Sequence, residues 1–600
     1  MRTRVTLAFV LMIVLAGCGI GPANSFVAST VLAATGEYAN PLRITLPDGS
    51  LAESCPDPSV IHGQTSGDDY WYMYCTNERF HDNGRIHLMP ISKSKDLVNW
   101  TYVGDIFQNV PSWVAGPNLL WAPDIQYFNG KYYLYYAAGN TVAGGAAIFV
   151  AISETPVGPW TAIPTPVVEP EPVPGRGMRS TIDSFLLQDG GQKYIFYGSF
   201  NGGISVRFVS SDGLTSDRAS EVQVAQSDRY EAAYVVKHDG YFYLMVSAGG
   251  CCAGPLSGYG VYVARSRSPF GPYIDKDGNS MMDARVGGTP ILTMNGNRWI
   301  GPGHNAVVID AGGQDWMMYH AIDAEKPYFA GSWTRRPVML DPIEWIDGWP
   351  TVRGGAGPSD ASQPAPVMDS TSPSTYQAVM APMDSPGTPI AASSDEFNGN
   401  RLSSQWSWIR PPASGSFAVA NGVLQFNTQN GDIYEGRHDA SVLTEPVPAG
   451  DYMIEVKLST SQPITGIDNF VQGGVVIYKD DSSYVKLVAS SINTTRQIEF
   501  GKQVSTSQSP LYGATFLASP SDWTWLRLVK RSAAGHELYT AYSSHDGVNW
   551  TRGGTWTHSL GPAARIGLVS MCGAGFQSYF DYILPDTGVP SSPTWWTTRR

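Results

Sequence analysis

Four carboxylates and one histidine occupy the same place in five similar stretches of this sequence. They are Asp57, Asp124, Asp183, Glu231 and His304, and each leads an apolar segment, a glycine-containing turn and an aromatic-rich segment. Carboxylates that a fold gathers and buries repel one another, so the pKa values of some of them rise. Such a set can supply both an acid and a base near neutral pH. These residue types indicate acid–base chemistry, provided that the fold brings them together.

The five stretches predict a repeated, four-stranded unit. They read "DPSVIHGQTSGDDYWYMYCT", "DIQYFNGKYYLYYAA", "DSFLLQDGGQKYIFYG", "EAAYVVKHDGYFYLMVS" and "HNAVVIDAGGQDWMMYHA". Each is typical of two strands around a turn, and the intervals between stretches leave room for about two more strands. Four strands make one propeller blade, so we expect a five-bladed β-propeller over residues 40–353. Taken alone, Asp57 before a proline is also typical of a turn. In a propeller the five leading residues would form a polar ring at one mouth of the channel.

Beyond the repeats the composition changes twice. Residues 354–392 are rich in proline and serine and contain no Lys or Arg, which is typical of a linker. Residues 394–586 alternate apolar and polar positions in short runs such as "DYMIEVKLS" and "RIGLVSMC". This alternation predicts an antiparallel β-sandwich. The expected fold class is therefore all-β, a five-bladed propeller followed by a sandwich.

The net charge and the aromatic content limit the kinds of ligand that the protein can bind. The 600 residues carry a formal net charge of -13, which offers no basic surface for a phosphate backbone, so nucleic acid is excluded as a partner. The aromatic content of 12% fits an uncharged ligand such as a sugar, against which flat rings pack. We expect a monomer without an organic cofactor.

The N-terminus resembles an export signal. Arg2 and Arg4 precede the apolar run Val5–Ala16, which is too short to span a bilayer. The run ends in Leu-Ala-Gly-Cys18, which resembles a bacterial lipobox, and residues 1–18 would then be a lipoprotein signal peptide that leaves a lipid on Cys18. The alternative is an ordinary signal that contains a cysteine by chance. Either way we expect an exported protein, anchored at the cell surface or secreted.

Export allows disulfides. Cys55 precedes one predicted strand and Cys75 ends the next, so an antiparallel hairpin would place them opposite each other. We expect that bond. The state of Cys251, Cys252 and Cys572 stays open at this point.

Residues 40–353 resemble glycoside hydrolase family 43, most closely its arabinanases, through "DPSV", "LWAPDI", "STIDSFLL", "YEAAYV", "GGCCAG", "GPGHNAV" and "LDPIEWIDGWP". The resemblance implies that Asp57 is a general base that activates water and that Glu231 is the general acid. It implies that Asp183 orients Glu231 and tunes its pKa. The family inverts the anomeric centre, which requires room for a water molecule between acid and base.

Three positions depart from the usual arabinanase pattern. Ser184 and Ala233 stand where prolines usually flank the catalytic residues, and Asn201 stands where a tryptophan usually follows "GSF". The last change removes an expected sugar platform. Trp121 and Asp124 remain the candidates for substrate binding, although Trp121 could equally pack between blades.

His304 belongs to "GPGH", which in the arabinanases holds a calcium ion through otherwise water-filled coordination. The resemblance therefore implies a calcium site at His304. The alternative is a buried core histidine.

Residues 394–586 resemble the concanavalin-like sandwich that follows many family 43 propellers, through "DEFNGNRLSSQWSWIRPP", "SHDGVNW" and "FDYI". The sandwich could close the pocket or bind sugar independently. The resemblance implies an arabinan endo-1,5-α-L-arabinosidase. Alternatives are an exo-acting α-L-arabinofuranosidase, a β-xylosidase, a retaining invertase-like enzyme and a non-catalytic sugar-binding lipoprotein.

Overall fold

The computed structural model describes residues 36–372, 374–463, 469–506, 510–533 and 535–587. The predicted signal segment, with Cys18, lies outside these residues. Three short 3-10 helices occur among the described elements, η1 (Arg218–Ser220), η2 (Gly254–Leu256) and η3 (Arg353–Gly355), and the rest are β-strands. Within the described residues, a search for helices with the length and hydropathy of a membrane span finds none. The predicted all-β class is confirmed.

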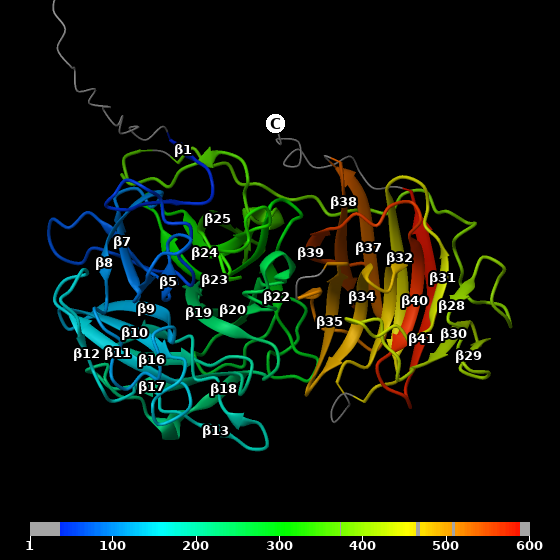
Figure 1. Ribbon diagram of the computed structural model, residues 1–600, viewed down its shortest axis with the longest axis horizontal. Coiled ribbons are helices and arrows are strands. Elements are labelled where there is room, and N and C mark those ends of the chain that lie inside the picture. Colours follow the sequence, from blue (N-terminus) through cyan, green and yellow to red (C-terminus); the bar gives the residue numbers. More distant parts are fainter. Residues whose placement is uncertain (1–35, 373, 464–468, 507–509, 534, 588–600) are drawn as a thin grey trace, which may run out of the picture. The chain divides into compact units, whose positions relative to one another are not determined.

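Five sheets form the blades of a propeller, coloured blue to green in Figure 1. Blade 1 has, from the channel outward, β3 (Ser59–His62), β4 (Trp71–Tyr74), β7 (Pro90–Ser94), β8 (Asn99–Asp105) and β2 (Arg43–Thr45), of which β2 pairs with β8 in parallel. Blade 2 has β9 (Leu120–Phe128), β10 (Lys131–Ala138), β11 (Ala147–Ser153) and β12 (Thr161–Ala162). Blade 3 has β15 (Phe185–Asp189), β16 (Gln192–Tyr197), β17 (Ile204–Val209) and β18 (Val222–Ala225).

Blades 4 and 5 complete the ring. Blade 4 has β19 (Glu231–His238), β20 (Tyr241–Ala248), β21 (Gly260–Ser266) and β22 (Thr289–Leu292). Blade 5 has β23 (Trp299–Ile309), β24 (Asp315–Asp323), β25 (Val338–Ile346) and β26 (Trp349–Val352). Three two-stranded pairs decorate the blades, namely β5 (Glu78–Arg79) with β6 (Ile86–His87), β13 (Pro172–Val173) with β14 (Gly177–Met178), and β1 (Glu37–Tyr38) with β27 (Gln363–Pro364).

Neighbouring blades cover both faces of each middle strand, which explains the aromatic runs. All residues of β10 after Lys131 are buried, and the same continuous burial occurs in β20 after Tyr241. A strand that is covered on both faces has no polar side, so it lacks the alternation of a half-exposed strand. The runs "KYYLYYAA" and "YFYLMVSA" therefore follow from their place in the middle of a blade.

The inner strands β3, β9, β15, β19 and β23 contact one another in cyclic order, so the ring is closed. The N-terminal segment secures the closure. Asn40 donates to the backbone oxygen of Leu340 in blade 5 at 3.0 Å, whereas β2, a few residues later, adds the outer strand of blade 1. One short segment thus joins the first blade to the last.

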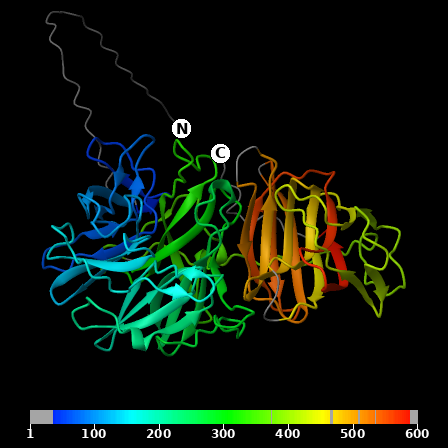
Figure 2. The ribbon, with the colours of Figure 1, turned by 60° about the horizontal axis from the view of Figure 1, so that its bottom comes forward.

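The C-terminal region is a sandwich of two seven-stranded antiparallel sheets, coloured yellow to red in Figures 1 and 2. One sheet has the order β28 (Ser407–Ile409), β31 (Val442–Pro446), β40 (Arg565–Met571), β33 (Gln472–Asp480), β34 (Ser483–Ile492), β35 (Thr495–Gln503) and β36 (Tyr512–Phe516). The other has β29 (Phe417–Ala420), β30 (Val423–Asn427), β41 (Gln577–Asp586), β32 (Tyr452–Thr460), β37 (Thr524–Ala533), β38 (His536–Ser544) and β39 (Thr551–Thr557). A large apolar cluster that includes Leu487, Phe500 and Leu526 fills the space between them.

The described part of segment 354–392 carries few strands but makes buried contacts. The backbone N–H of Val367 donates to Asp310 of blade 5 at 3.0 Å, and Tyr376 bonds to Glu344. Further along, the buried carboxylate of Asp384 accepts a bond of 2.9 Å from Arg531 of the sandwich. The segment is thus attached to the propeller near its start and to the sandwich near its end.

Among the described residues, four cysteines form two disulfides. The expected bond between Cys55 and Cys75 is confirmed, and it joins the entry of β3 to the end of β4. Cys251 and Cys252, adjacent in sequence, are bonded to each other in the loop after β20. Cys572 is the free cysteine among the described residues.

Candidate active site

Each blade has one residue in a left-handed backbone conformation either within its inner strand or just before that strand begins. The φ values are 56° for Asp57, 48° for Ala122, 56° for Asp183, 55° for Ala232 and 50° for His304. Such values are uncommon for residues other than glycine, and they persist where the surroundings impose them. The five residues therefore mark structurally equivalent positions around the channel mouth.

A polar group from the preceding blade binds the backbone N–H of four of these residues. Ala122 donates to Thr76 Oγ1 at 2.7 Å, Ala232 to Asp183 Oδ2 at 3.1 Å, His304 to Ser247 Oγ at 2.9 Å and Asp57 to His320 Nδ1 at 3.3 Å. The bond from Asp57 to His320 crosses from blade 1 back to blade 5. These hydrogen bonds pair the backbone N–H groups and also join each blade to the next around the channel mouth.

The repeat register differs from the sequence prediction in two blades. In blade 2 the equivalent position is Ala122, and Asp124 lies two residues further along β9. In blade 4 it is Ala232, and Glu231 lies one residue before it. Asp57, Asp183 and His304 hold the predicted position. Glu231 still reaches the site because its side chain is bound there, as described below.

Asp57 is surrounded by cationic and hydrogen-bonding groups. Arg336 Nη1 donates to its Oδ1 at 3.0 Å, and Thr76 Oγ1 donates to its Oδ2 at 2.7 Å. The Nδ1 atoms of His320 and His304 lie 3.1 Å and 3.4 Å from Oδ1. Burial by itself would raise the pKa of Asp57, but Arg336 and the two histidines outweigh it and hold that pKa well below its ordinary value. Asp57 is therefore a carboxylate that stays ionised.

Asp183 has the opposite character. Burial, followed by the negative charges of Glu231 and Asp57, raises the pKa of Asp183 well above its ordinary value. Its Oδ2 accepts the N–H of Ala232, the residue after Glu231. The surroundings of Asp183 therefore disfavour its ionised form, in contrast to those of Asp57, and its carboxyl group binds the backbone beside Glu231.

Glu231 begins β19 and projects toward two hydroxyl groups. Ser199 Oγ donates to its Oε2 at 2.9 Å, and Tyr259 OH donates to its Oε1 at 2.6 Å. Tyr259 also stacks on His320, with ring planes 9° apart, and so links Glu231 to the surroundings of Asp57. A Cβ atom on Gly303 would lie 2.2 Å from the Tyr259 ring, so only glycine lets the ring take this place. Both oxygens of Glu231 are thus oriented by fixed donors.

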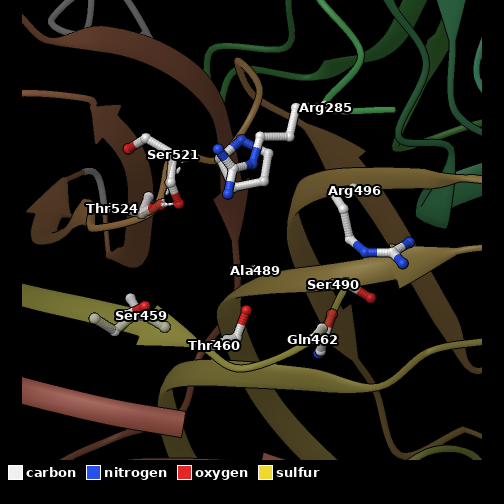
Figure 3. Close-up of a pocket in the computed structure, with 11 residues that line it drawn as sticks. Arg285, Ser459, Thr460, Gln462, Ala489, Ser490, Arg496, Ser521 and Thr524 are labelled. Atoms are coloured by element: carbon white, nitrogen blue, oxygen red, sulfur yellow. Dashed lines mark hydrogen bonds between the residues drawn. The ribbon is translucent and has the colours of Figure 1, made fainter. Parts of the chain in front are cut away.

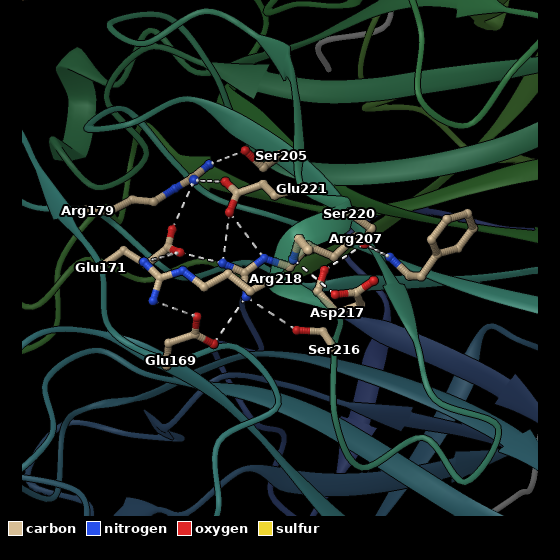
Figure 4. Close-up of polar contacts among 12 residues, drawn as sticks. Glu169, Glu171, Arg179, Ser205, Arg207, Ser216, Asp217, Arg218, Ser220 and Glu221 are labelled. Carbon is tan, nitrogen blue, oxygen red and sulfur yellow. Dashed lines mark hydrogen bonds and ion pairs between the residues drawn. The ribbon is translucent and has the colours of Figure 1, made fainter.

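Arg179 links a buried ionic network, which Figure 4 shows, to the loop that carries Ser199. Arg179 Nη2 donates to the backbone oxygen of Gly203 at 3.0 Å. Arg179 also pairs with Glu171 and Glu221, and the fully buried Arg207 pairs with the same two acids. Each buried cation thus has carboxylate partners, and Arg179 is bound both by these acids and by the loop.

Asp124 and Trp121 lie in blade 2. The Asp124 carboxylate accepts the N–H of Leu186 in blade 3 at 2.7 Å, and burial raises its pKa to about 7. Trp121 donates to the backbone oxygen of Asn118, and its ring packs so closely on Gly139 that a Cβ atom there would lie 2.3 Å from it. The structure shows packing contacts for both side chains.

Five side chains around the carboxylates were not among the sequence-based candidates, namely Thr76, Ser199, Tyr259, His320 and Arg336. Three of them share a signal. Thr76 and Ser199 lie two residues beyond the end of the second strand of their blades, His320 lies within the second strand β24, and each follows an aromatic run. The polar residue that follows each aromatic run is therefore the signal that these three share. Tyr259 and Arg336 lie in connecting segments without a repeat signal.

The departures at Ser184, Ala233 and Asn201 leave the carboxylates in place. Asn201 Nδ2 donates to the backbone oxygens of Arg176 and Met178 at 3.1 and 2.7 Å. Where a tryptophan was expected, the chain therefore has an amide that ties the Ser199 loop to the β13–β14 hairpin.

His304 offers few ligands to a metal ion. Among the described residues no group of three or more His, Cys, Asp or Glu side chains could hold one. The nearest carboxylate, Asp57, is already held by Arg336. A calcium ion prefers oxygen ligands, so one imidazole fits only an ion whose remaining ligands are water.

The site combines an ionised carboxylate with an oriented carboxylic acid. These are the two groups that hydrolysis by general acid–base catalysis requires. A carboxylate such as Asp57 can remove a proton from water. An acid such as Glu231, if protonated, can deliver a proton to a leaving oxygen.

Arg336→Gln should move the acidic limb of the pH–rate profile to higher pH. Loss of the guanidinium removes a positive charge that favours ionised Asp57, so the pKa of Asp57 rises and less of the base is ionised at low pH. We expect a shift of roughly one pH unit in kcat/KM. Arg335→Gln is the control, because Arg335 pairs with Glu53 and Asp82 and not with Asp57. An unchanged acidic limb in Arg336→Gln would contradict the assigned charge balance.

Two family models match the chain. The model of Glycosyl hydrolases family 43 matches residues 50–350, and the model of the Beta xylosidase C-terminal Concanavalin A-like domain matches residues 394–564. The two matched ranges correspond to the propeller and to most of the sandwich.

Curated relatives match the propeller. An extracellular exo-alpha-(1->5)-L-arabinofuranosidase of Cellvibrio japonicus is 31% identical over 310 residues, which cover 47% of this chain and 83% of that protein. An extracellular endo-alpha-(1->5)-L-arabinanase of Bacillus subtilis is 32% identical over 323 residues, which cover 50% of this chain and 89% of that protein. A solved alpha-L-arabinanase structure from Cellvibrio cellulosa is 29% identical, with a TM-score of 0.42, and covers 50% of this chain and 95% of that one.

Proposed function

Because the chain belongs to glycosyl hydrolase family 43 and is therefore a glycoside hydrolase, we propose that it is an exported, inverting enzyme that cleaves α-1,5 bonds between arabinofuranosyl residues inside a polysaccharide chain. One observation supports this most directly. Asp57, whose pKa is held well below its ordinary value, shares a channel mouth with Glu231, whose two oxygens are oriented by Ser199 and Tyr259.

The reaction assigns one role to each carboxyl group. Asp57 takes a proton from a water molecule, which attacks the anomeric carbon. Glu231 gives its proton to the leaving sugar oxygen as the glycosidic bond breaks. Asp183 keeps Glu231 in place by accepting a hydrogen bond from the backbone N–H of Ala232, the residue after Glu231. A single displacement of this kind inverts the anomeric configuration.

The substrate class is tested by product analysis. The protein is incubated with linear arabinan, branched arabinan and xylan, and the products are sized over time. Mixed arabino-oligosaccharides at early times support endo cleavage, and arabinose as the first product supports the exo-acting alternative. Proton magnetic resonance of the first product should show inverted configuration. A retained product would contradict the mechanism.

A β-xylosidase is the second candidate. It is favoured by the sandwich, which matches the C-terminal domain model of that enzyme class. Release of xylose from xylo-oligosaccharides, without action on arabinan, would select this candidate in the same assay.

We propose that His304 holds a calcium ion whose other ligands are water. Calcium would supply positive charge beside Asp57. A chelator should then lower the melting temperature or the activity of the parent protein and change neither in His304→Ala. An equal response of both proteins to the chelator would contradict the site.

We also propose that the protein is exported and anchored to the membrane by a lipid on Cys18. Two relatives are extracellular by name, and the sequence ahead of Cys18 resembles a lipobox. Mass spectrometry of the mature N-terminus should find a lipid-modified Cys18. A mature chain that begins at another residue would support secretion instead.

A further inference from the structure

The segment immediately before Glu231 is bound by the C-terminal sandwich. From Glu37 onward the chain forms one compact unit, which includes propeller and sandwich. Arg229, two residues before Glu231, is a propeller residue and is only 3% exposed. Its Nη1 donates to Gln497 Oε1 on β35 at 2.6 Å, and its Nη2 donates to the backbone oxygen of Leu517 at 2.9 Å. Both hydrogen-bond acceptors of this buried cation thus come from the sandwich.

Aromatic rings enclose the Arg229 guanidinium. Its central carbon lies 4.5 Å from the ring centroid of Phe516, 4.9 Å from that of Tyr262 and 5.2 Å from that of Tyr230. Phe516 belongs to the sandwich and the tyrosines to the propeller. A guanidinium between aromatic faces is held in one plane, so Arg229 has little freedom to move.

Asp228 is bound from the same side. Its carboxylate, also buried, accepts Asn493 Nδ2 at 2.8 Å and Thr494 Oγ1 at 3.2 Å, both from the turn between β34 and β35. Gln497 Nε2 donates to its backbone oxygen at 3.0 Å. From the propeller, Arg176 pairs with the carboxylate. Asp228 has a φ of 70°, a conformation that such contacts must maintain.

Without these sandwich contacts, the segment would hold a buried cation and a buried anion with missing partners. Leaving buried charged groups unsatisfied is costly, so the segment would rearrange. Glu231 would move with it, because its backbone is fixed on one side by pairing with Ser247 and on the other by residues 228–230. Asp228 also donates its N–H to the backbone oxygen of Phe200, next to Ser199, which binds Glu231.

We propose that the sandwich positions the general acid. Arg229 and Gln497 are positioning residues: they touch no reacting atom, and they hold residues 228–230 so that Glu231 faces Ser199, Tyr259 and the leaving oxygen. The sandwich is thereby part of the catalytic unit. This inference rests on the proposed role of Glu231.

The test uses the full-length protein and two substrates, an arabino-oligosaccharide and an aryl arabinofuranoside with an acidic phenol as leaving group. Only the first needs a proton from the acid. Gln497→Ala and Arg229→Met should lower kcat on the oligosaccharide by roughly tenfold to a hundredfold, because a small displacement of a catalytic group has effects of this size. KM should change by less than about threefold, and the rate on the aryl substrate should stay near that of the parent.

Arg285→Met is the matched control. Arg285 also joins the propeller to the sandwich, through an ion pair with the exposed Asp522, and it makes no bond to residues 228–231. Figure 3 shows it beside Ser521 and Thr524, in a pocket that none of residues 228–231 lines. This variant should keep both rates. Arg229→Lys, which retains a cation between the rings, should recover part of the lost kcat.

Glu231→Ala is measured in parallel, and it separates the two hypotheses. If Glu231→Ala fails to discriminate between the substrates, the proposed acid is wrong. If Glu231→Ala loses activity on the oligosaccharide but not on the aryl substrate, the acid is confirmed and Gln497→Ala tests the positioning role. That role is wrong if Gln497→Ala keeps the parent kcat on the oligosaccharide. It is also wrong if Gln497→Ala loses activity equally on both substrates. Should Arg229→Met not fold, Gln497→Ala alone decides, because it leaves the Arg229 cation between its rings.

Discussion

Glu231→Ala should nearly abolish cleavage of arabinan while it retains much of the rate on an aryl arabinofuranoside with an acidic phenol. A sugar alkoxide is a poor leaving group and needs a proton, whereas an acidic phenol departs without one. General acid catalysis contributes on the order of a hundred- to ten-thousand-fold in rate, so the loss on arabinan should fall in that range. The measurement is kcat/KM on both substrates.

Two controls make this result specific. Ser199→Ala removes one donor to Glu231 and leaves the carboxyl group, so it should reproduce the pattern with a smaller loss. The melting temperature of each variant shows whether the fold is intact. Equal losses of Glu231→Ala on both substrates would contradict its role as the acid.

Asp57→Ala should be inactive on both substrates. Every substrate needs an activated water molecule whatever its leaving group, so the rate on the aryl glycoside should fall as well. We expect losses of on the order of a hundred- to ten-thousand-fold on each. The buried Arg336 guanidinium would also lose its bond to Asp57 Oδ1.

Azide provides the sharper readout for Asp57→Ala. The anion can occupy the space that the carboxylate leaves and attack the anomeric carbon of the aryl substrate directly. The product should be an arabinosyl azide of inverted configuration, which proton magnetic resonance identifies. An azide product of retained configuration, or a parent-like rate without azide, would contradict the assignment of Asp57.

Much of the fold could be predicted because its signals are local. Strand, turn and aromatic strand recur five times in the sequence, and a strand that is covered on both faces needs a continuous apolar run, as in β10. The disulfide between Cys55 and Cys75 followed from a single hairpin. Asp57, Asp183 and His304 could be predicted because they occupy the same position in their repeats.

The register failed where the local pattern was ambiguous. "WAPDI" contains one acid, and the repeat pattern predicts Asp124 at the ring, whereas the left-handed residue is Ala122. When a residue other than glycine adopts the left-handed conformation, the pattern of polar and apolar residues in the sequence does not reveal it. The same ambiguity separates Glu231 from Ala232 by one residue.

The fold class, the five repeats and three residues of the ring could be predicted from the sequence, because they depend on periodicity within tens of residues. The groups that surround the carboxylates come from distant parts of the chain and are visible only in the folded molecule. Arg336 reaches Asp57 across 279 positions, and Gln497 reaches Arg229 across 268. Such contacts arise only when the propeller ring closes and the sandwich packs against it, and neither event has a local signal. The burial and charges that set the pKa values of Asp57 and Asp183 are likewise sums over distant segments, which no short stretch of sequence contains.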